Sequence, residues 1–227
     1  MAPSASGLEM QTMFRIALAV PYVLGINSGA SLGVALFTLA LPMLGGLSGT
    51  LFMRLGITGV AWIGSAAILL LVMMLSRKIK SVSTILIIGM MLGSAISAIV
   101  GVLQYMGSEE SLKAFVVWTM GSLSTVTMAD IAIFAPVIII GLVLGIAAIK
   151  SLNMLLLGEG YARTMGLNVR RSRTILFLST TLLAGTVTAF CGPITFIGLS
   201  VPHIARLLLR SSNHNTLLPV TMLCGAI

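Results

Sequence analysis

The most regular feature of this sequence is a series of apolar runs, most of them about as long as a helix that crosses a membrane, separated by short polar or basic segments. Strands of a membrane barrel would be shorter and would alternate polar with apolar residues. The pattern predicts an all-α, polytopic bundle of transmembrane helices that forms a single domain over residues 1–227. Gly192-Pro193 is expected to break one helix and Pro202 to interrupt the next. The expected spans are Tyr22–Leu44, Leu55–Leu75, Val82–Met106, Ala129–Ile149, Thr174–Phe190 and Ile194–Leu209.

Two further apolar runs are too short to cross a bilayer. Leu8–Leu18 could be the tail of a spanning helix, with Arg15 at its polar end and Pro21 opening the next element. At the other end, the run from Asn215 to Ile227 stops before it reaches a spanning length. We therefore expect a partial bundle, truncated at both ends.

Composition supports an integral membrane protein. Hydrophobic residues make up 58% of the chain and charged residues 8%, whereas a soluble domain usually carries about a quarter charged residues. The net charge of +8 does not indicate a nucleic-acid partner, because the basic residues gather at the ends of the apolar runs rather than on one soluble face.

The basic residues also predict the orientation of the bundle. When successive span ends are placed alternately on two sides, only two of the 13 basic residues, Arg54 and Lys113, fall on one side. The positive-inside rule makes the other side cytoplasmic. The cytoplasmic set is Arg15, Arg77, Lys78, Lys80, Lys150, Arg163, Arg170, Arg171, Arg173, Arg206 and Arg210.

Ser108–Thr127, on the opposite side, is a partly polar segment that contains Glu109 and Glu110. We expect it to lie at the outer membrane surface. Trp118 within it should place its indole near the lipid headgroups, where tryptophan is enriched.

Two spans carry small residues at every fourth position. On a helix this spacing puts them on one face, where a neighbouring backbone can approach closely. Close packing is the preferred interpretation for both faces, although the second could also leave room for a solute. The residues are Gly25, Gly29 and Gly33 in the first span, and Gly89, Gly93, Ser97 and Gly101 in Val82–Met106.

The segment 152–173 is a cytoplasmic loop under this orientation. It holds Glu159, the only acid between Ile131 and Ile227. Its length allows one or two short helices, with a break near Gly166.

Two interpretations of Glu159 remain open from the residues alone. It could simply pair with Arg163 four residues later, which would contribute only a few tenths of a kcal/mol. Alternatively, a short amphipathic helix with Glu159, Tyr161, Arg163 and Met165 could dock into a groove of a partner.

No set of residues indicates catalysis. His203 and His214 have no carboxylate or cysteine at ligand spacing, and there is no glycine-rich phosphate loop or Ser/His/Asp arrangement. Cys191 and Cys224 lie in apolar surroundings and are interpreted as packing residues. His203, next to Pro202, is better explained as a histidine hydrogen-bonded at a helix break than as a metal ligand. We therefore expect no enzyme activity, no metal site and no cofactor bound by this chain.

Three stretches resemble one family. LNMLLLGEGYARTMGLNVRRSR contains the form LGE..A...G, and AFCGPITFIGLSVPHIARLLL contains GPI.F.GL..PHI.R. Together with PYVLGINSGASLGVAL near the start, they resemble the FecCD-type permease subunits of ATP-driven importers for iron-siderophore complexes, haem and cobalamin. The likeness runs from about Leu8 to Ile227, essentially the whole chain.

The resemblance implies a fold, a location and an assembly. The fold would be that of the cobalamin and iron-siderophore importer permeases, embedded in lipid as a multi-pass protein of the bacterial inner (plasma) membrane. A second permease copy, most simply in a homodimer, would carry the solute along the interface. ATP would be bound by a separate cytoplasmic ATP-binding subunit, and a periplasmic or lipid-anchored substrate-binding protein would deliver the cargo.

The resemblance also implies roles for two sets of residues. The first would form the short coupling helices that sit in a cleft of the ATPase: Gly158, Glu159, Ala162, Arg163 and Gly166. The second would lie beside the translocation path or in close helix packing next to it: Gly89, Gly93, Ser97, Gly101, Gly192, Pro193, Phe196, Gly198, Pro202 and His203.

The chain departs from the family pattern at Ile16-Ala17, where Asn-Pro is usual, and family members extend further at both ends. An inactive membrane remnant of such a permease is therefore one alternative. A secondary transporter is another, but it would need ionisable residues deep in its spans, and apart from Asp130 near one end the spans show none.

Overall fold

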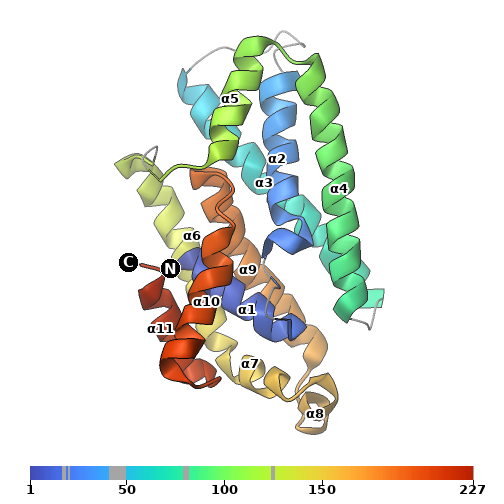
Figure 1. The fold of residues 1–227 in the computed structure, drawn as a ribbon, viewed down its shortest axis with the longest axis vertical. Helices are drawn as coiled ribbons and strands as arrows, with labels where there is room; N and C mark the ends of the chain where they lie inside the picture. Colours follow the sequence, from blue (N-terminus) through green and yellow to red (C-terminus); the bar gives the residue numbers. More distant parts are fainter. Residues whose placement is uncertain (17–18, 20, 41–49, 79–81, 124–125, 227) are drawn as a thin grey trace.

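The computed structural model describes residues 1–16, 19, 21–40, 50–78, 82–123 and 126–226, and the regular structure within these ranges is helical (Figure 1). The prediction of an all-α bundle is confirmed. In chain order the elements are α1 (Ala2–Phe14), η1 (Pro21–Leu24), α2 (Ile26–Ala35), η2 (Leu36–Ala40), α3 (Thr50–Lys78), α4 (Val82–Met106), α5 (Glu109–Met120), α6 (Met128–Ala147), α7 (Ile149–Leu156), α8 (Glu159–Thr164), α9 (Val169–Cys191), α10 (Phe196–Leu209) and α11 (His214–Cys224).

Four described helices, α3, α4, α6 and α9, are long and apolar enough to cross a membrane. They correspond to four of the predicted spans, and α4 has the predicted bounds. The spanning stretches are Gly56–Leu75, Thr84–Met106, Asp130–Ala147 and Val169–Cys191.

The prediction of one continuous span over Tyr22–Leu44 is wrong for its described part. Gly25 has a φ of 79°, in the left-handed region that a continuous helix cannot pass through. The chain therefore forms the short 3₁₀ turn η1, then α2, then the π-helical η2. Residues 41–44 lie outside the described residues.

Pro202 does not interrupt its helix as predicted, because α10 continues through it. The hydrogen bond that Pro202 cannot donate would have gone to the Gly198 carbonyl, four residues earlier. That carbonyl faces Gly7 of α1, and a Cβ on Gly7 would overlap it. The two glycines therefore allow α1 and α10 to cross in backbone contact.

A second close crossing joins α2 to α3. A Cβ on Gly29 would overlap the Gly64 carbonyl oxygen, and one on Gly33 would overlap that of Val60. The packing interpretation of this small-residue face is thus confirmed for Gly29 and Gly33. Gly25 instead faces α4, close to the backbone of Gly89.

The helix α1 lies inside the bundle, packed by α6, α7, α9, α10 and α11 (Figure 1). All of its residues except Pro3 are buried. Its Met10 and Phe14 pack in one apolar cluster with Phe177 of α9 and with Leu152 and Leu155 of α7. This cluster fixes the short helix α7 against the end of the bundle.

Candidate functional site

The segment between α6 and α9 forms two short helices at one end of the bundle (Figure 1). The predicted break near Gly166 is present, since α8 ends at Thr164 and α9 begins at Val169, and a second break separates α7 from α8 at Gly158, which has a φ of 107°. Gly166, with a φ of 83°, turns the chain from α8 toward α9. The guanidinium of Arg15, just after α1, lies beside Gly158, so α1 and the α7–α8 turn meet here.

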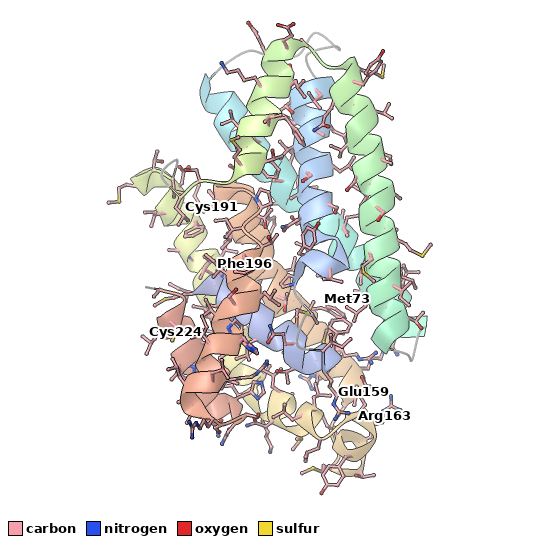
Figure 2. The ribbon with its side chains drawn as sticks, in the orientation of Figure 1. Met73, Glu159, Arg163, Cys191, Phe196 and Cys224 are labelled. Atoms are coloured by element: carbon pink, nitrogen blue, oxygen red, sulfur yellow. The ribbon has the colours of Figure 1, made fainter. Side chains whose placement is uncertain are left out.

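Glu159 has a different main partner from the one its sequence neighbours suggest. Its carboxylate accepts a hydrogen bond from the guanidinium of Arg173 on α9, whereas the nearest Arg163 nitrogen lies 3.9 Å away. The Glu159 and Arg173 side chains are 24% and 12% exposed, and Arg163 is 62% exposed. Figure 2 labels Glu159 and Arg163 at the α8 end of the molecule. Glu159 therefore fastens α8 to α9, and sequence reasoning missed Arg173 because it lies fourteen positions away on another helix.

The outer surface of this helix pair is apolar. Leu157, Tyr161 and Met165 are 61%, 56% and 50% exposed, while Ala162 is fully buried against the bundle. The predicted coupling set is therefore divided: Gly158 and Ala162 face inward, Glu159 is half-buried, and Arg163 and Gly166 face solvent.

A groove of about 320 Å³ adjoins this surface. Met154 and Leu157 of the α7 end, Met165 after α8 and Asn215 of α11 line it, with Lys150 at its rim. We call the exposed residues Leu157, Tyr161, Arg163 and Met165 the α8 surface. Its mixture of apolar and basic groups suits contact with another protein better than contact with water alone.

The predicted small-residue face of α4 divides into two halves. Gly89 is buried and Gly93 lies close to Ser28 of α2, so this half packs. Ser97 and Gly101 are exposed, and a Cβ on Gly101 would meet nothing within 4 Å. The second half is therefore open to lipid, to solute or to another chain.

The remaining residues of the predicted path set also separate. Gly192, with a φ of 78°, lies against the backbone of Trp118 and Gly121, and Gly198 packs on α1. Phe196 and His203 are exposed. The helix α4 packs mainly on α2, whereas α10 packs mainly on α1 and α11. The predicted path residues of α4 therefore have different helix neighbours from those of α10.

The two prolines of this set and His203 differ in burial. Pro202 is buried and Pro193 is half-buried. His203 makes no hydrogen bond to any described residue, so its interpretation as a hydrogen-bonded histidine at a helix break is wrong. The physical reason is that α10 is continuous there and turns the imidazole outward.

Trp118 of α5 combines a buried indole nitrogen with a partly exposed ring. Its indole N–H is buried and has no acceptor among the described residues. The ring packs on Phe115, with centroids 6.3 Å apart, and borders a cavity of about 310 Å³ whose lining includes Ser122, Asp130 and Phe190. The indole nitrogen is thus turned into the chain, while the residue as a whole is partly exposed.

Glu9 is the buried charged residue that sequence reasoning missed. It is 1% exposed in the middle of α1, with Oε1 2.8 Å from Ser179 Oγ and Oε2 3.0 Å from Thr180 Oγ1. The expectation that the spans carry no charge at their centres did not cover this shorter helix. An acid inside the apolar run Leu8–Leu18 was the available signal.

Further polar contacts tie α1 to its neighbours. Arg206 of α10 donates a hydrogen bond to Gln11 Oε1 at 2.8 Å. His214 of α11 lies between Thr12 and Asn153 of α7, with Nε2 2.7 Å from Thr12 Oγ1 and Nδ1 2.9 Å from Asn153 Oδ1. The buried helix is thus bonded to α10 and α11, and through His214 to α7, which leads into α8.

The sequence of this chain matches a known protein family. Residues 1–227 match the description of the FecCD transport family over their whole length. The chain belongs to the FecCD transport family.

Several members of the FecCD family are similar to this chain. It is 36% identical to the hemin transport system permease protein HmuU of Yersinia pestis, over 99% of this chain and 66% of HmuU. It is 34% identical to the vitamin B12 import system permease protein BtuC of Vibrio cholerae, over 99% of this chain and 65% of BtuC. It is also 34% identical to the molybdate import system permease protein MolB of Haemophilus influenzae, over 97% of this chain and 63% of MolB.

A solved structure agrees with this assignment. It is described as an inward-facing conformation of an ABC transporter assigned to the metal-chelate type, and it superposes with a TM-score of 0.81 at 30% identity, over 99% of this chain and 69% of the other. The chain spans about two thirds of the length of the curated relatives named above. With its apolar helices and its family, it is a multi-pass protein of the inner membrane.

Proposed function

We propose that this FecCD-family chain is the membrane-spanning permease subunit of an ATP-driven, binding-protein-dependent importer for an iron-siderophore complex, haem or cobalamin. The α8 surface carries the proposal. It presents exposed apolar residues on a short helix pair at the basic, cytoplasmic side, where a soluble motor subunit would dock.

Docking at the α8 surface would move the bundle because α7 and α8 are fastened to it. Leu152 and Leu155 anchor α7 in the core, and the pair between Glu159 and Arg173 anchors α8 to α9. Asn153 joins α7 to α11 through His214. A push on the α8 surface would therefore be passed to α1, α9 and α11 as a rigid-body movement rather than absorbed in a loose loop.

An importer of this kind needs partners besides the permease subunit. A cytoplasmic ATP-binding subunit supplies ATP binding and hydrolysis, and an external substrate-binding protein, periplasmic or lipid-anchored, delivers the cargo. A second permease copy, forming a homodimer, is the partner we propose for the open half of α4, around Ser97 and Gly101.

The cargo class rests on the relatives, which are named for hemin, vitamin B12 and molybdate. Haem and cobalamin are large and partly apolar, as are many siderophore complexes, which suits a path between apolar helices. Molybdate is included in the uptake assay because it is a small oxyanion. Uptake of molybdate would assign the chain to a different cargo class from the large chelates.

The testing experiment is co-purification of the chain with its ATP-binding subunit, followed by uptake of labelled iron-siderophore, haem, cobalamin and molybdate into vesicles. We expect Tyr161→Asp to abolish retention of the ATPase, because it puts a charge into the apolar centre of the docking surface. Tyr105→Asp is the matched control, since Tyr105 is 93% exposed at the end of α4, away from α8.

Each alternative predicts a different result. Uptake that follows an ion gradient without the ATPase would identify a secondary transporter. A wild-type chain that never retains the ATPase would identify an inactive remnant. Equal retention by wild type and Tyr161→Asp would remove the α8 surface as the docking site.

A further inference from the structure

The most unusual polar group of the described molecule is the carboxyl of Glu9. It lies in the centre of α1, and no described cation comes within 4 Å of its oxygens. Gly145 of α6 makes room for it, because a Cβ at that position would overlap Oε1. The absence of a side chain at Gly145 therefore provides the space that the Glu9 carboxyl occupies between the helices.

The hydroxyl contacts around this carboxyl determine where the protons lie. Ser179 Oγ is 2.8 Å from Glu9 Oε1 and 2.9 Å from the Gly141 carbonyl oxygen, so it touches two acceptors if Glu9 is ionised. A hydroxyl has only one proton to donate. With an ionised Glu9, one of these two buried contacts would be an oxygen–oxygen approach without a hydrogen.

A neutral Glu9 satisfies every contact. Its Oε1–H donates to Ser179 Oγ, whose own proton goes to the Gly141 carbonyl, and Thr180 donates to Oε2 at 3.0 Å. Each oxygen then has the role that its protonation allows. Burying a carboxylate removes its hydration, and without a nearby cation nothing offsets that free-energy cost. Such groups take up a proton and become neutral instead.

We propose that Glu9 is a neutral carboxylic acid that clamps α1 to α6 and α9, and that it positions the coupling helices. The second part rests on the proposed function. Gly141 lies on α6, which leads into α7–α8, and Ser179 and Thr180 lie on α9, which leads out of them. The clamp therefore holds both stems of the helix pair against the same buried helix.

The contacts favour a clamp over a proton-transfer site. A relay needs a succession of groups that exchange protons near neutral pH, whereas the polar side chains that contact Glu9 are the hydroxyls of Ser179 and Thr180. The other ionisable groups of this region, Arg206 and His214, bond to Gln11 and Thr12 instead.

The protonation state is tested by infrared difference spectroscopy of the purified full chain in lipid nanodiscs at neutral pH, wild type minus Glu9→Gln. We expect the carbonyl band of a protonated carboxyl, absent from the variant. Ser179→Ala should shift that band, because it removes the acceptor of the Glu9 proton. A difference spectrum that contains only carboxylate bands would overturn the proposal, whatever the chain transports.

The positioning role is tested with the ATPase complex. Glu9→Gln keeps one donor and one acceptor in place, so its melting temperature and its ratio of ATP hydrolysed to cargo imported should match wild type. Glu9→Leu fills the space without hydrogen bonds and should raise that ratio several-fold. An unchanged ratio in Glu9→Leu would limit Glu9 to packing. If Glu9→Leu does not fold, Ser179→Ala provides the same comparison.

Discussion

The helices α1 and α4 each bring a glycine close to a neighbouring backbone, yet they occupy opposite environments. α1 is buried on all sides and bonds through Glu9, Gln11 and Thr12 to α9, α10 and α11. In α4, only 28% of the spanning stretch is buried, and residues such as Met91 and Val102 are exposed. The polar side chains of α1 set it apart from the more apolar α4, because polar groups within a membrane require protein partners.

The largest effect that separates these helices concerns their glycines. Gly7→Leu should unfold the chain or destabilise it by about 3 kcal/mol or more, because its side chain would enter the backbone of α10 at Gly198. Gly101→Leu, on the open half of α4, should not lower the melting temperature of the monomeric chain in detergent, because no atom of this chain lies within 4 Å of an added Cβ. Thermal unfolding followed by size-exclusion chromatography measures both, and equal melting temperatures would contradict the assigned crossing of α1 and α10.

A smaller effect concerns the bond between α7 and α11. Asn153 accepts hydrogen bonds from the backbone N–H of His214 and contacts its ring, so Asn153→Ala should lower the free energy of unfolding by about 1–2 kcal/mol. Asn215→Ala is the control, because Asn215 is exposed at the groove. Faster amide hydrogen exchange in α7, seen only in Asn153→Ala, would locate the loss.

The smallest effect distinguishes the two partners of Glu159. Arg173→Ala should lower the free energy of unfolding by about 1 kcal/mol. This is less than the loss of a fully buried charged hydrogen bond, because Glu159 is partly exposed. Arg163→Ala should lower it by only about a few tenths of a kcal/mol. Chemical denaturation of the two variants measures the difference. A larger loss in Arg163→Ala would mean that the exposed pair is the stabilising one.

The same pair corrects an expectation about docking. From the sequence, Glu159→Lys is expected to uncouple the ATPase without disturbing the fold, because Glu159 is assigned to an exposed loop. In the structure the new lysine would face Arg173, so the variant would loosen α8 itself. Tyr161→Asp, which leaves this pair intact, is the cleaner probe.

The sequence is sufficient for features that depend on local pattern. The runs that became α3, α4, α6 and α9 were predicted because a spanning helix is recognisable from its own length and hydropathy. The glycine spacing predicted a close helix crossing. It did not identify Gly64 as the partner of Gly29, since partners are chosen by tertiary packing.

Features that depend on distant residues were out of reach of the sequence. Glu9 and Ser179 lie 170 positions apart, and no periodicity connects them. Glu159 and Arg173 lie on different helices and meet only because Gly158 and Gly166 turn the chain. The path residues could be placed on helices, but the sequence did not show that those of α4 and those of α10 pack on different neighbouring helices.

The most direct test of the central claim is site-directed cross-linking at the α8 surface. Cys191 and Cys224 would be replaced by serine, and a single cysteine introduced as Met165→Cys or, as the control, Tyr105→Cys. We predict that Met165→Cys forms a cross-link to the ATP-binding subunit whose yield changes when ATP is added, while Tyr105→Cys forms none. Cross-linking from Tyr105→Cys, or none from Met165→Cys in a complex that still imports cargo, would contradict coupling through α8.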